Sequence, residues 1–445
     1  MMKRTSGYLY WVFPGMLSVV ALGALISGRD LSQAFNDLAG PAGAGVQHPL
    51  IPWAQRLVSL VLLGASAERI FNHVSMHKRM PSVLLTSTFL IYWVCSVAAP
   101  AFFGSHPQLA HEYLYPLVFG FACLLTTVPE RDKILEASRN ALFLFMLVGV
   151  ALIPVAFSLV MDASYNQGLI PGLPRFGGLA PHPVAMGMFS VTAMLCLWAR
   201  PFRRRWLQRA AWLLGLGVLF VAQSKTAWIA FMLCALAMTV VRNGPAALNR
   251  MGDPKEASFG VGACLSAIAI AVALIWALLV ADVGSDVAGF FDTAQGAQLV
   301  SMTGRDQIWA IAIDEWRSSP LFGYGPGLWN DEFRASINMP NATNAHNQFM
   351  DTLARSGGVG AAALVLYALV LLVLSLRYAS ATRGLSLALF LALALLSISE
   401  VPLILFGYGT ELFAHLLLII TLASAASARE PAAQARARPF YRTAS

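Results

Sequence analysis

One histidine, His346, has the residue type and position of a general base. It lies in the run Asn344-Ala345-His346-Asn347, where the sequence predicts the first turn of a helix that continues to Arg355. The positive end of a helix dipole disfavours imidazolium, so a neutral imidazole that accepts a proton is expected there. The spacing alone favours a histidine that caps or packs the helix start, and the catalytic interpretation depends on its surroundings.

Three isolated cations could form an anion site. Arg305 stands at a predicted helix N-terminus, where the dipole disfavours a cation unless it faces an anionic ligand. Lys225 is alone in an apolar turn, and Arg175 lies in the glycine-rich loop 171–178. Contact with lipid phosphate explains any one of them. Three together favour a shared site, because guanidinium and ammonium groups suit phosphate oxygens.

Metal ligands are not clustered in the sequence. It contains no Asp-x-Asp and no Cys or His pair at metal-ligand spacing. The adjacent carboxylates of Asp314-Glu315 and Asp331-Glu332 would point apart on a helix. We therefore expect a mechanism without a metal ion or other cofactor.

The chain that carries these residues is mostly apolar. Of its 445 residues, 58% are hydrophobic and 12% are charged, whereas a soluble domain has about 25% charged residues. The net charge of +8 comes from short basic runs between apolar segments, which is typical of membrane topology and not of a nucleic-acid-binding surface. We predict an all-α, polytopic membrane protein that contacts membrane lipids and no nucleic acid.

Apolar runs predict about twelve transmembrane helices, each needing roughly 17–25 residues. The predicted limits are 8–27, 51–71, 82–103, 113–129, 141–162, 183–199, 210–223, 226–241, 259–281, 358–376, 385–399 and 403–425. Most lysines and arginines fall on one side of this arrangement, which the positive-inside rule makes cytoplasmic. The exceptions on the other side are Arg29, Arg56, Arg175, Lys225, Arg305, Arg317, Arg334 and Arg355.

This topology divides the chain into four parts. Residues 1–281 would hold spans one to nine with a cytoplasmic N-terminus, and 282–357 a large outer loop that carries the candidate chemistry. Residues 358–425 would hold spans ten to twelve, and 426–445 a disordered cytoplasmic tail. Loops this long in compact proteins are usually functional.

The large loop itself has a helical pattern. Thr303-Gly304-Arg305-Asp306 has the form of a capping box, and Pro320 would end the helix that it opens. The glycine-rich turn 321–327 follows and contains Tyr324. The loop is therefore expected to hold at least two helices between spans nine and ten.

Several of these motifs, in this order, resemble the signature of the O-antigen ligase/polymerase superfamily. The resemblance covers residues from about 175 to 360. Its motifs are Arg175 to Leu179 with Pro181-His182-Pro183, Gln223 to Ala227, Thr303 to Trp309, Ser319 to Gly327, and Ala345-His346-Asn347 through Leu353, Gly357 and Gly360. The family more often has arginine where this chain has Lys225, which keeps the charge but loses bidentate geometry.

The resemblance implies an O-antigen ligase-type glycosyltransferase in the bacterial inner membrane with its active site on the periplasmic face. Its donor would be a glycan on undecaprenyl diphosphate, and its acceptor the core oligosaccharide of lipid A. Lys225, Arg305 and Arg175 would bind the diphosphate, and His346 with Arg305 would be catalytic in an inverting transfer. The supporting residues would be Asn347, Tyr324 and His182.

Other functions fit the same pattern. O-antigen polymerases and protein O-oligosaccharyltransferases share this donor and differ in acceptor, and the twelve-span layout with a compact loop favours the ligase. A transporter or flippase is a different class, for which His415, Glu400 and Glu411 would be the ionisable residues within or near a span. The absence of an inverted repeat in the sequence and the long one-sided loop argue against transport.

Overall fold

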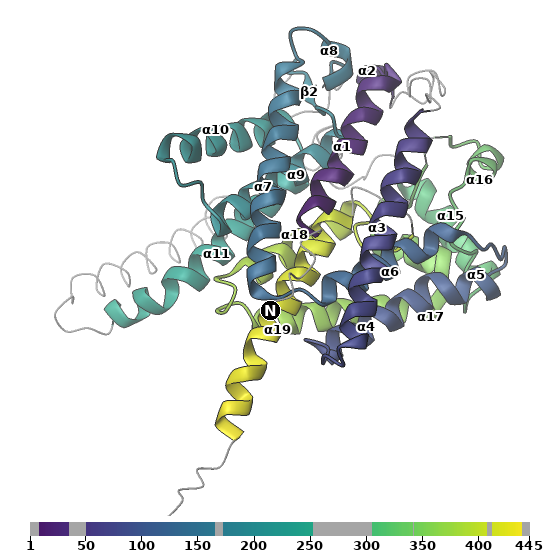
Figure 1. The fold of residues 1–445 in the computed structure, drawn as a ribbon. Coiled ribbons are helices and arrows are strands. Elements are labelled where there is room, and N and C mark those ends of the chain that lie inside the picture. The colour runs from purple at the N-terminus through teal and green to yellow at the C-terminus, as the bar shows by residue number, and fades with distance from the viewer. Residues whose placement is uncertain are drawn as a thin grey trace, which may run out of the picture.

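The computed structural model describes residues 9–34, 50–164, 172–251, 305–340, 342–406 and 412–437. Nearly all of its regular elements are helices (Figure 1). In chain order these are α1 (Leu9–Ser27), α2 (Leu31–Ala34), α3 (Leu50–Ser75), α4 (Val83–Trp93), the π-helix η2 (Val94–Ala98), α5 (Ala99–Phe103), the 3₁₀-helix η3 (His111–Tyr113), α6 (Leu114–Leu124), α7 (Val128–Ala151), α8 (Phe157–Val160), α9 (Pro183–Ala199), α10 (Arg205–Val221), α11 (Lys225–Met251), α15 (Arg305–Ser318), α16 (Asp331–Ser336), α17 (Gln348–Arg377), α18 (Leu385–Ser399) and α19 (Leu412–Ala437). The strands β1 (Met161–Asp162) and β2 (Arg175–Phe176) form one antiparallel pair.

Six of the described helical segments are long and apolar enough to cross a membrane. They are Leu9–Ser27, Leu50–Ser75, Val83–Phe103, Val128–Ala151, Lys225–Ala246 and Gln348–Arg377. Shorter apolar helices are formed by Pro183–Ala199, Leu385–Ser399 and Leu412–Ala428. The chain is therefore a multi-pass, helical membrane protein. The count of twelve spans stays a prediction, and the ninth, 259–281, lies outside the described residues.

Two predicted spans, 183–199 and 385–399, coincide with α9 and α18, but the fifth, predicted at 141–162, has different limits. The helix at that place, α7, begins at Val128 because Thr127 and Glu130 form a capping box around its first turn. It ends at Ala151, and the chain then turns into α8 and β1. The charged first half of α7 is helical although it is not apolar.

The last helix also differs from the prediction. Residues 403–406 are irregular, and α19 is described from Leu412. It continues to Ala437, so residues 426–437 are not the disordered tail that was expected. This segment is rich in alanine, which has the highest helix propensity.

The core of the bundle lies around α19, which is buried on every side from Leu412 to Ala426. Such all-round burial is expected of a central helix. Within this core His415 Nε2 lies 2.8 Å from the hydroxyl of Tyr367 on α17, and the Tyr367 ring stacks on Tyr92 of α4. His415 is thus a packing and hydrogen-bonding residue of the core.

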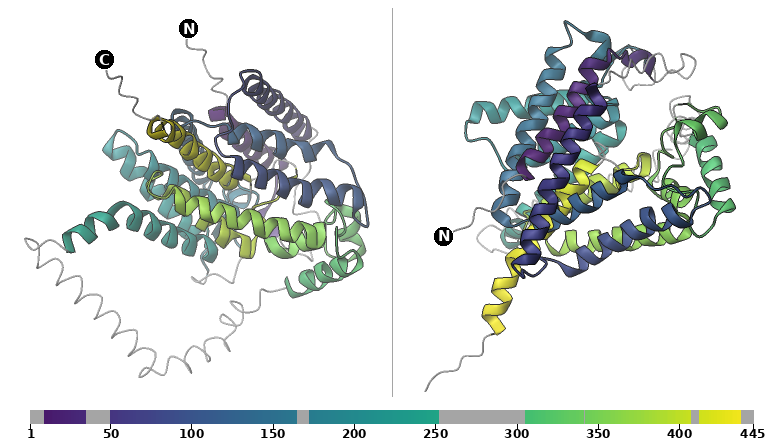
Figure 2. Two further views of the ribbon diagram at one scale, coloured as in Figure 1. Left: turned by 90° about the horizontal axis from the view of Figure 1, so that it is seen from below. Right: turned by 45° about the vertical axis from the view of Figure 1, so that its right-hand side comes forward.

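The α15–α16 segment gathers at the N-terminal end of α17, beside α5 (Figures 1 and 2). The helix α17 joins the loop to the membrane bundle, because one helix runs from Gln348 to Arg377 with a non-helical residue, Gly357, inside it. The predicted loop helix and the predicted tenth span are therefore two parts of one kinked helix.

Candidate active site

The loop has a small hydrophobic core of its own. Ala312 of α15, Phe333 of α16 and Ala354 of α17 are buried together with Leu328 and Trp329 from the turn between them. This apolar contact fixes α15 and α16 against the start of α17. The candidate site residues on this loop are therefore held on a packed unit.

The glycine-rich turn is bonded to the kink of α17 through the backbone. The Tyr324 and Gly325 N–H groups donate to the carbonyls of Ala354 and Arg355, each at 2.9 Å. Gly323 and Gly357 both have positive φ, 66° and 62°, and a side chain on either would collide with the opposite backbone. Glycine at both positions allows the two segments to lie in contact.

The backbone before His346 is fixed on both sides. The Asp351 carboxylate, 1% exposed, accepts hydrogen bonds from Ala345 N–H at 3.0 Å and from Trp329 Nε1 at 2.8 Å. Its other oxygen pairs with Arg355 Nε at 2.8 Å. The Ala345 carbonyl accepts from Trp309 Nε1 at 2.9 Å. Ala345 is thus held at its N–H and its C=O, which sets the direction of the next residue.

The sequence predicted His346 in the first turn of a helix, but the residue lies just before α17. Its φ is 47°, in the left-handed region, and its N–H donates to Asn344 Oδ1 at 2.7 Å. Asn347 is the N-cap, and its Oδ1 accepts from the backbone of Phe349 and Met350 at 3.0 Å. Because the cap role belongs to Asn347, the His346 ring is free of it.

The His346 ring is paired with Glu400, at the C-terminal end of α18. His346 Nδ1 lies 3.2 Å from Glu400 Oε2, with both side chains partly buried. A carboxylate only accepts hydrogen bonds, so Nδ1 is the nitrogen that donates to it, and in a neutral ring the lone pair is then on Nε2. This contact was not predicted, because Glu400 was considered only as a residue of a transport pathway.

Two further hydrogen bonds hold the end of α18 against the start of α17. Asn347 Nδ2 donates to the Ile398 carbonyl at 3.2 Å. The buried Gln348 accepts from Leu403 N–H at 2.7 Å. Asn347 and Gln348 therefore fix the start of α17 against the end of α18, beside the His346–Glu400 pair.

Arg175 lies in β2, and His182 lies at the end of the loop that leads from β2 to α9. Arg175 is buried, and its Nε donates to the Ala222 carbonyl at 2.8 Å, which ties this loop to the end of α10. His182 caps α9 by accepting from Val184 N–H through Nδ1 at 3.1 Å. Both residues are thus held by the backbone of neighbouring helices.

The electrostatics of His182 show which charged groups surround it. Burial lowers the pKa of His182 to about 4, and the nearby Arg175, His346 and Arg305 lower it further, whereas Glu400 opposes the shift. Burial also lowers the pKa of Arg305, and Glu400 again raises it. Charged residues from distant segments of the chain therefore contribute to the electrostatics around His182.

Lys225 begins α11 beside the end of α18. The next residue, Thr226, has its hydroxyl 3.3 Å from that of Ser399, the residue before Glu400. The turn before Lys225 is fixed by Gln223, whose φ is 49° and whose Nε2 donates to the Leu173 carbonyl at 2.8 Å. Lys225 is therefore close in the fold to the His346–Glu400 pair.

Tyr324 has a different role from the one expected. Its ring stacks on His106, with centroids 4.0 Å apart and 16° between the planes, and it contacts Phe333 edge-on. The pKa of Tyr324 is raised by burial and by the charges of Glu315 and Glu332. Its side chain thus packs the loop against the segment after α5 and does not join the His346 group.

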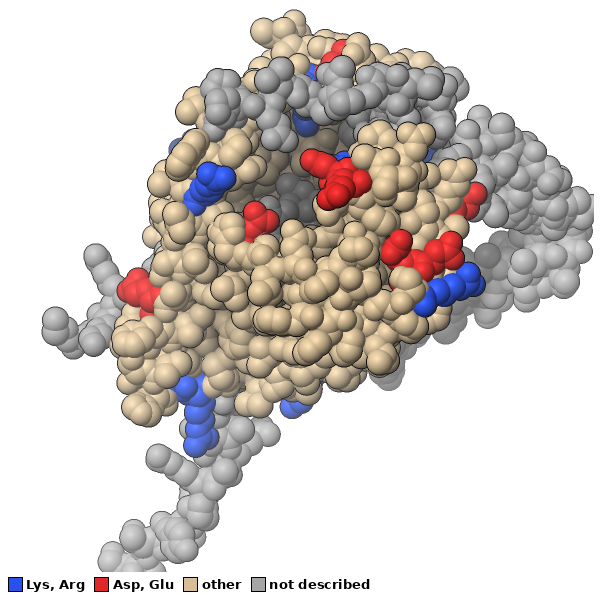
Figure 3. Space-filling model, turned by 90° about the vertical axis from the view of Figure 1, so that its right-hand side faces the viewer, with Lys and Arg blue, Asp and Glu red and all other residues tan. Residues whose placement is uncertain are grey.

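Seen from the side on which α15 and α16 lie, the molecule is hollowed, and acidic and basic side chains border the opening (Figure 3). Within the described ranges, no three His, Cys, Asp or Glu side chains are grouped so that they could hold a metal ion. The arrangement can bind a polyanion through its cations and offer one neutral imidazole nitrogen to a hydroxyl.

The fold and the site define a multi-pass helical membrane protein with a cationic, histidine-containing site at one end of its bundle. Residues 210–365 match the model of a family described as O-antigen ligase. This match confirms the resemblance to the O-antigen ligase superfamily, and the family implies a membrane glycosyltransferase-like enzyme of O-antigen processing. The matched segment contains Lys225, Arg305 and His346, whereas Arg175 and Glu400 lie outside it. No curated protein matches the chain in sequence.

Proposed function

We propose that this protein is an O-antigen ligase, which transfers O-antigen glycan from undecaprenyl diphosphate to the core oligosaccharide of lipid A at the periplasmic face of the bacterial inner membrane. The observation that carries the proposal is the contact of His346 Nδ1 with Glu400 at 3.2 Å, inside a group that includes Arg175, His182 and Arg305. The family match supports the same reaction class.

In the proposed reaction, the acceptor hydroxyl attacks the anomeric carbon of the donor glycan. His346 Nε2 takes the hydroxyl proton, while Glu400 holds the Nδ1–H and stabilises the imidazolium that forms. Such an acid–base contribution is typically about 10²–10⁴-fold in rate. The new bond forms from the acceptor oxygen to the anomeric carbon on the face opposite the leaving group, so the configuration inverts.

The bond that breaks joins the anomeric carbon to the diphosphate oxygen, which leaves with the electron pair. Arg175, Arg305 and Lys225 would bind this diphosphate and stabilise the charge that develops on it. His182, neutral because its pKa is about 4, would add a hydrogen-bonding group without adding charge. No step in this scheme needs a metal ion.

The proposal is tested by reconstituting the purified protein with an undecaprenyl-diphosphate glycan and rough lipopolysaccharide in excess chelator. We expect glycan on the lipid A core with wild type and a loss of about 10²-fold or more in His346→Ala. His77→Ala is the matched control, because His77 is an exposed histidine at the end of α3. Longer glycan on the same carrier would instead identify a polymerase, and no transfer would favour the protein-acceptor or transporter functions.

Glu400 gives a second test of the same mechanism. Glu400→Gln retains the size of the side chain but replaces the charge that stabilises imidazolium, so kcat should fall while KM for the acceptor changes little. The measurement is a steady-state comparison with wild type at several pH values. Equal kcat in the two proteins would remove Glu400 from the mechanism.

A further inference from the structure

Three helices that pack on one another, α9, α11 and α18, run from the candidate site to the opposite end of the bundle. Each has a residue of the site at one end and an arginine about 25 Å away along its axis, at 1.5 Å per residue. The site residues are His182, Lys225 and Glu400, and the corresponding arginines are Arg200, Arg242 and Arg383. The arginines are therefore almost one hydrocarbon core, about 30 Å, from the site.

Hydrogen bonds bring these arginines together around the end of α9. Arg242 donates through Nε to the Arg383 carbonyl at 3.0 Å and through a terminal nitrogen to the Trp198 carbonyl at 3.4 Å. Arg139 of α7 donates to the carbonyl of Arg200, the C-cap of α9. Four segments that are distant in the sequence thus place arginines at one end of the bundle.

The helix that follows, α10, adds exposed cations at its N-terminus. These are Arg203, Arg204, Arg205 and Arg209. The positive end of a helix dipole disfavours cations, and like charges four residues apart on a helix, such as Arg205 and Arg209, repel each other. We call these four arginines, with Arg200, Arg242 and Arg383, the basic end. An anion bound there would remove both unfavourable terms.

Carboxylates do not balance the basic end. The sequence has no Asp or Glu between Asp162 and Asp253. Asp132 pairs with Arg200, but it also pairs with Arg131. Within the described part of the chain, no ion pair is formed by Arg203, Arg204, Arg205, Arg209 or Arg383. Positive charge is therefore in excess at this end.

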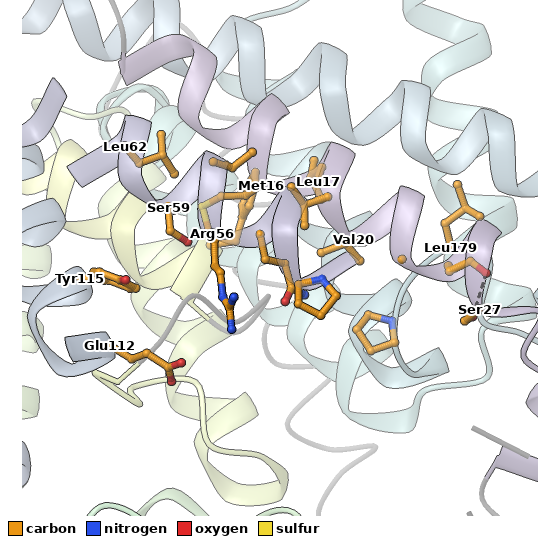
Figure 4. Close-up of a pocket in the computed structure, with 18 of the residues that line it drawn as sticks. Met16, Leu17, Val20, Ser27, Arg56, Ser59, Leu62, Glu112, Tyr115 and Leu179 are labelled. Atoms are coloured by element: carbon orange, nitrogen blue, oxygen red, sulfur yellow. Dashed lines mark hydrogen bonds between the residues drawn. The ribbon is translucent and has the colours of Figure 1, made fainter. Parts of the chain in front are cut away.

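The charged cavity between α1 and α3 differs in this respect. It has a volume of about 730 Å³, and Arg56 and Glu112 project into it and face each other (Figure 4). Its described lining includes none of the arginines of the basic end. The basic end is thus separate from this cavity, where a cation has a carboxylate opposite it.

The chemistry of the binding partner follows from the surface next to these cations. Trp206, Leu213 and Phe220 of α10 are 64%, 73% and 49% exposed. Their spacing of seven residues places them on one face of the helix. In a membrane protein such a face contacts acyl chains, and tryptophan beside basic residues is typical of the headgroup level. An anionic lipid fits both parts, whereas a soluble polyanion would leave the apolar face unexplained.

We propose that the basic end binds the headgroups of anionic phospholipids, with their phosphates at the arginines and their acyl chains along the exposed face of α10. The site faces the leaflet opposite the proposed reaction centre, so this inference does not depend on the proposed function. Guanidinium groups suit this role because they bind phosphate oxygens in pairs.

The first experiment titrates the purified full chain, in a nonionic detergent, with phosphatidylglycerol or phosphatidylcholine and counts bound lipids by native mass spectrometry. Wild type should bind phosphatidylglycerol more tightly. Arg205→Gln/Arg209→Gln should weaken that binding by about 25-fold, about fivefold for each arginine, and leave phosphatidylcholine binding unchanged. Lys78→Gln/Arg79→Gln is the matched control, because it also removes two exposed cations, after the end of α3, and should bind like wild type. Equal binding of the two lipids, or an equal loss in both double variants, would overturn the proposal.

The second experiment separates lipid binding from an effect on folding. Without lipid, Arg205→Gln/Arg209→Gln should have the Tm of wild type or a slightly higher one, because a repulsive pair is removed. Phosphatidylglycerol should raise Tm of wild type and not of this variant, and inorganic phosphate should raise neither. A lower Tm of the lipid-free variant would show a structural role for the two arginines instead. Equal stabilisation of wild type by inorganic phosphate would show a site for free anions, and either result contradicts a lipid site.

Discussion

Replacing Asp351 by asparagine should destabilise the protein and displace His346. The carboxylate is 1% exposed and its partner Arg355 is 6% exposed, so the substitution leaves a buried guanidinium without its counter-ion. Removing one member of a buried pair costs about 3–5 kcal/mol. The asparagine oxygen still accepts from Trp329 or Ala345, which places the expected loss near the lower value.

The activity should fall together with the stability. Asp351 fixes Ala345 N–H at 3.0 Å, and the His346 ring follows directly. A displacement of about 1 Å at a catalytic group costs roughly 10²-fold in rate. We therefore expect Asp351→Asn to lower kcat for glycan transfer by about that factor while donor binding is retained.

The assay is a double-mutant cycle with Arg355→Gln, in which unfolding is followed by tryptophan fluorescence during titration with a denaturing detergent. If the two charges are a coupled pair, the double variant loses both at once and is less destabilised than the sum of the single variants. A coupling energy of about 2 kcal/mol is expected, within the range measured for contacting residues. Additive effects within about 0.5 kcal/mol would refute the reasoning.

Three other predictions follow from the geometry of the site. The pKa of His182 is about 4 in the fold against an ordinary value of 6.5, so the unfolded chain binds more protons between these two pH values. The free energy of unfolding should therefore be at its full value above pH 6.5 and fall by up to about 3 kcal/mol toward pH 4. In His182→Asn, which keeps a capping group, the free energy of unfolding should depend less on pH. Lys225→Ala should lower kcat/KM for the donor by about 10²-fold and Lys225→Arg should restore most of it, because the charge carries the effect; a steady-state assay distinguishes them, and equal loss in both would contradict the role. Gly357→Ala should lower the free energy of unfolding by about 1–3 kcal/mol, and with it Tm, because Gly357 has a positive φ and a Cβ there collides with backbone. The neighbouring Gly358→Ala should have little effect. Similar Tm values for the two variants would contradict this explanation.

Local signals in the sequence were sufficient for some helices. The start of α9 is indicated by His182-Pro183, and the start of α18 is indicated by Gly384. The limits of α7 could not be found by counting apolar residues, because its first half is charged and its start is set by a capping box. A helix in a membrane protein can extend beyond its apolar part, and the sequence then shows the apolar part alone.

The candidate site could be predicted only as separate residues. The sequence singled out His346, Arg305, Arg175 and His182, and in the structure the first three affect the pKa of His182. It could not supply Glu400, because this residue reaches His346 only when the end of α18 packs against the start of α17. The position of His346 before the helix, and not in it, also depends on the three hydrogen bonds around Ala345 and Asn344.

The kink of α17 places the proposed reaction centre and the apolar span on two sides of one glycine, Gly357. The helix has 30 residues, about 45 Å at 1.5 Å per residue, and its longer part, after Gly357, is strongly apolar. A change in bilayer thickness alters the tilt of such a span. The shorter part is bonded to the loop through the Ala354 and Arg355 carbonyls, so the change in tilt is expected at Gly357. Membranes of different thickness would then move the part of α17 after Gly357, while His346 keeps its alignment.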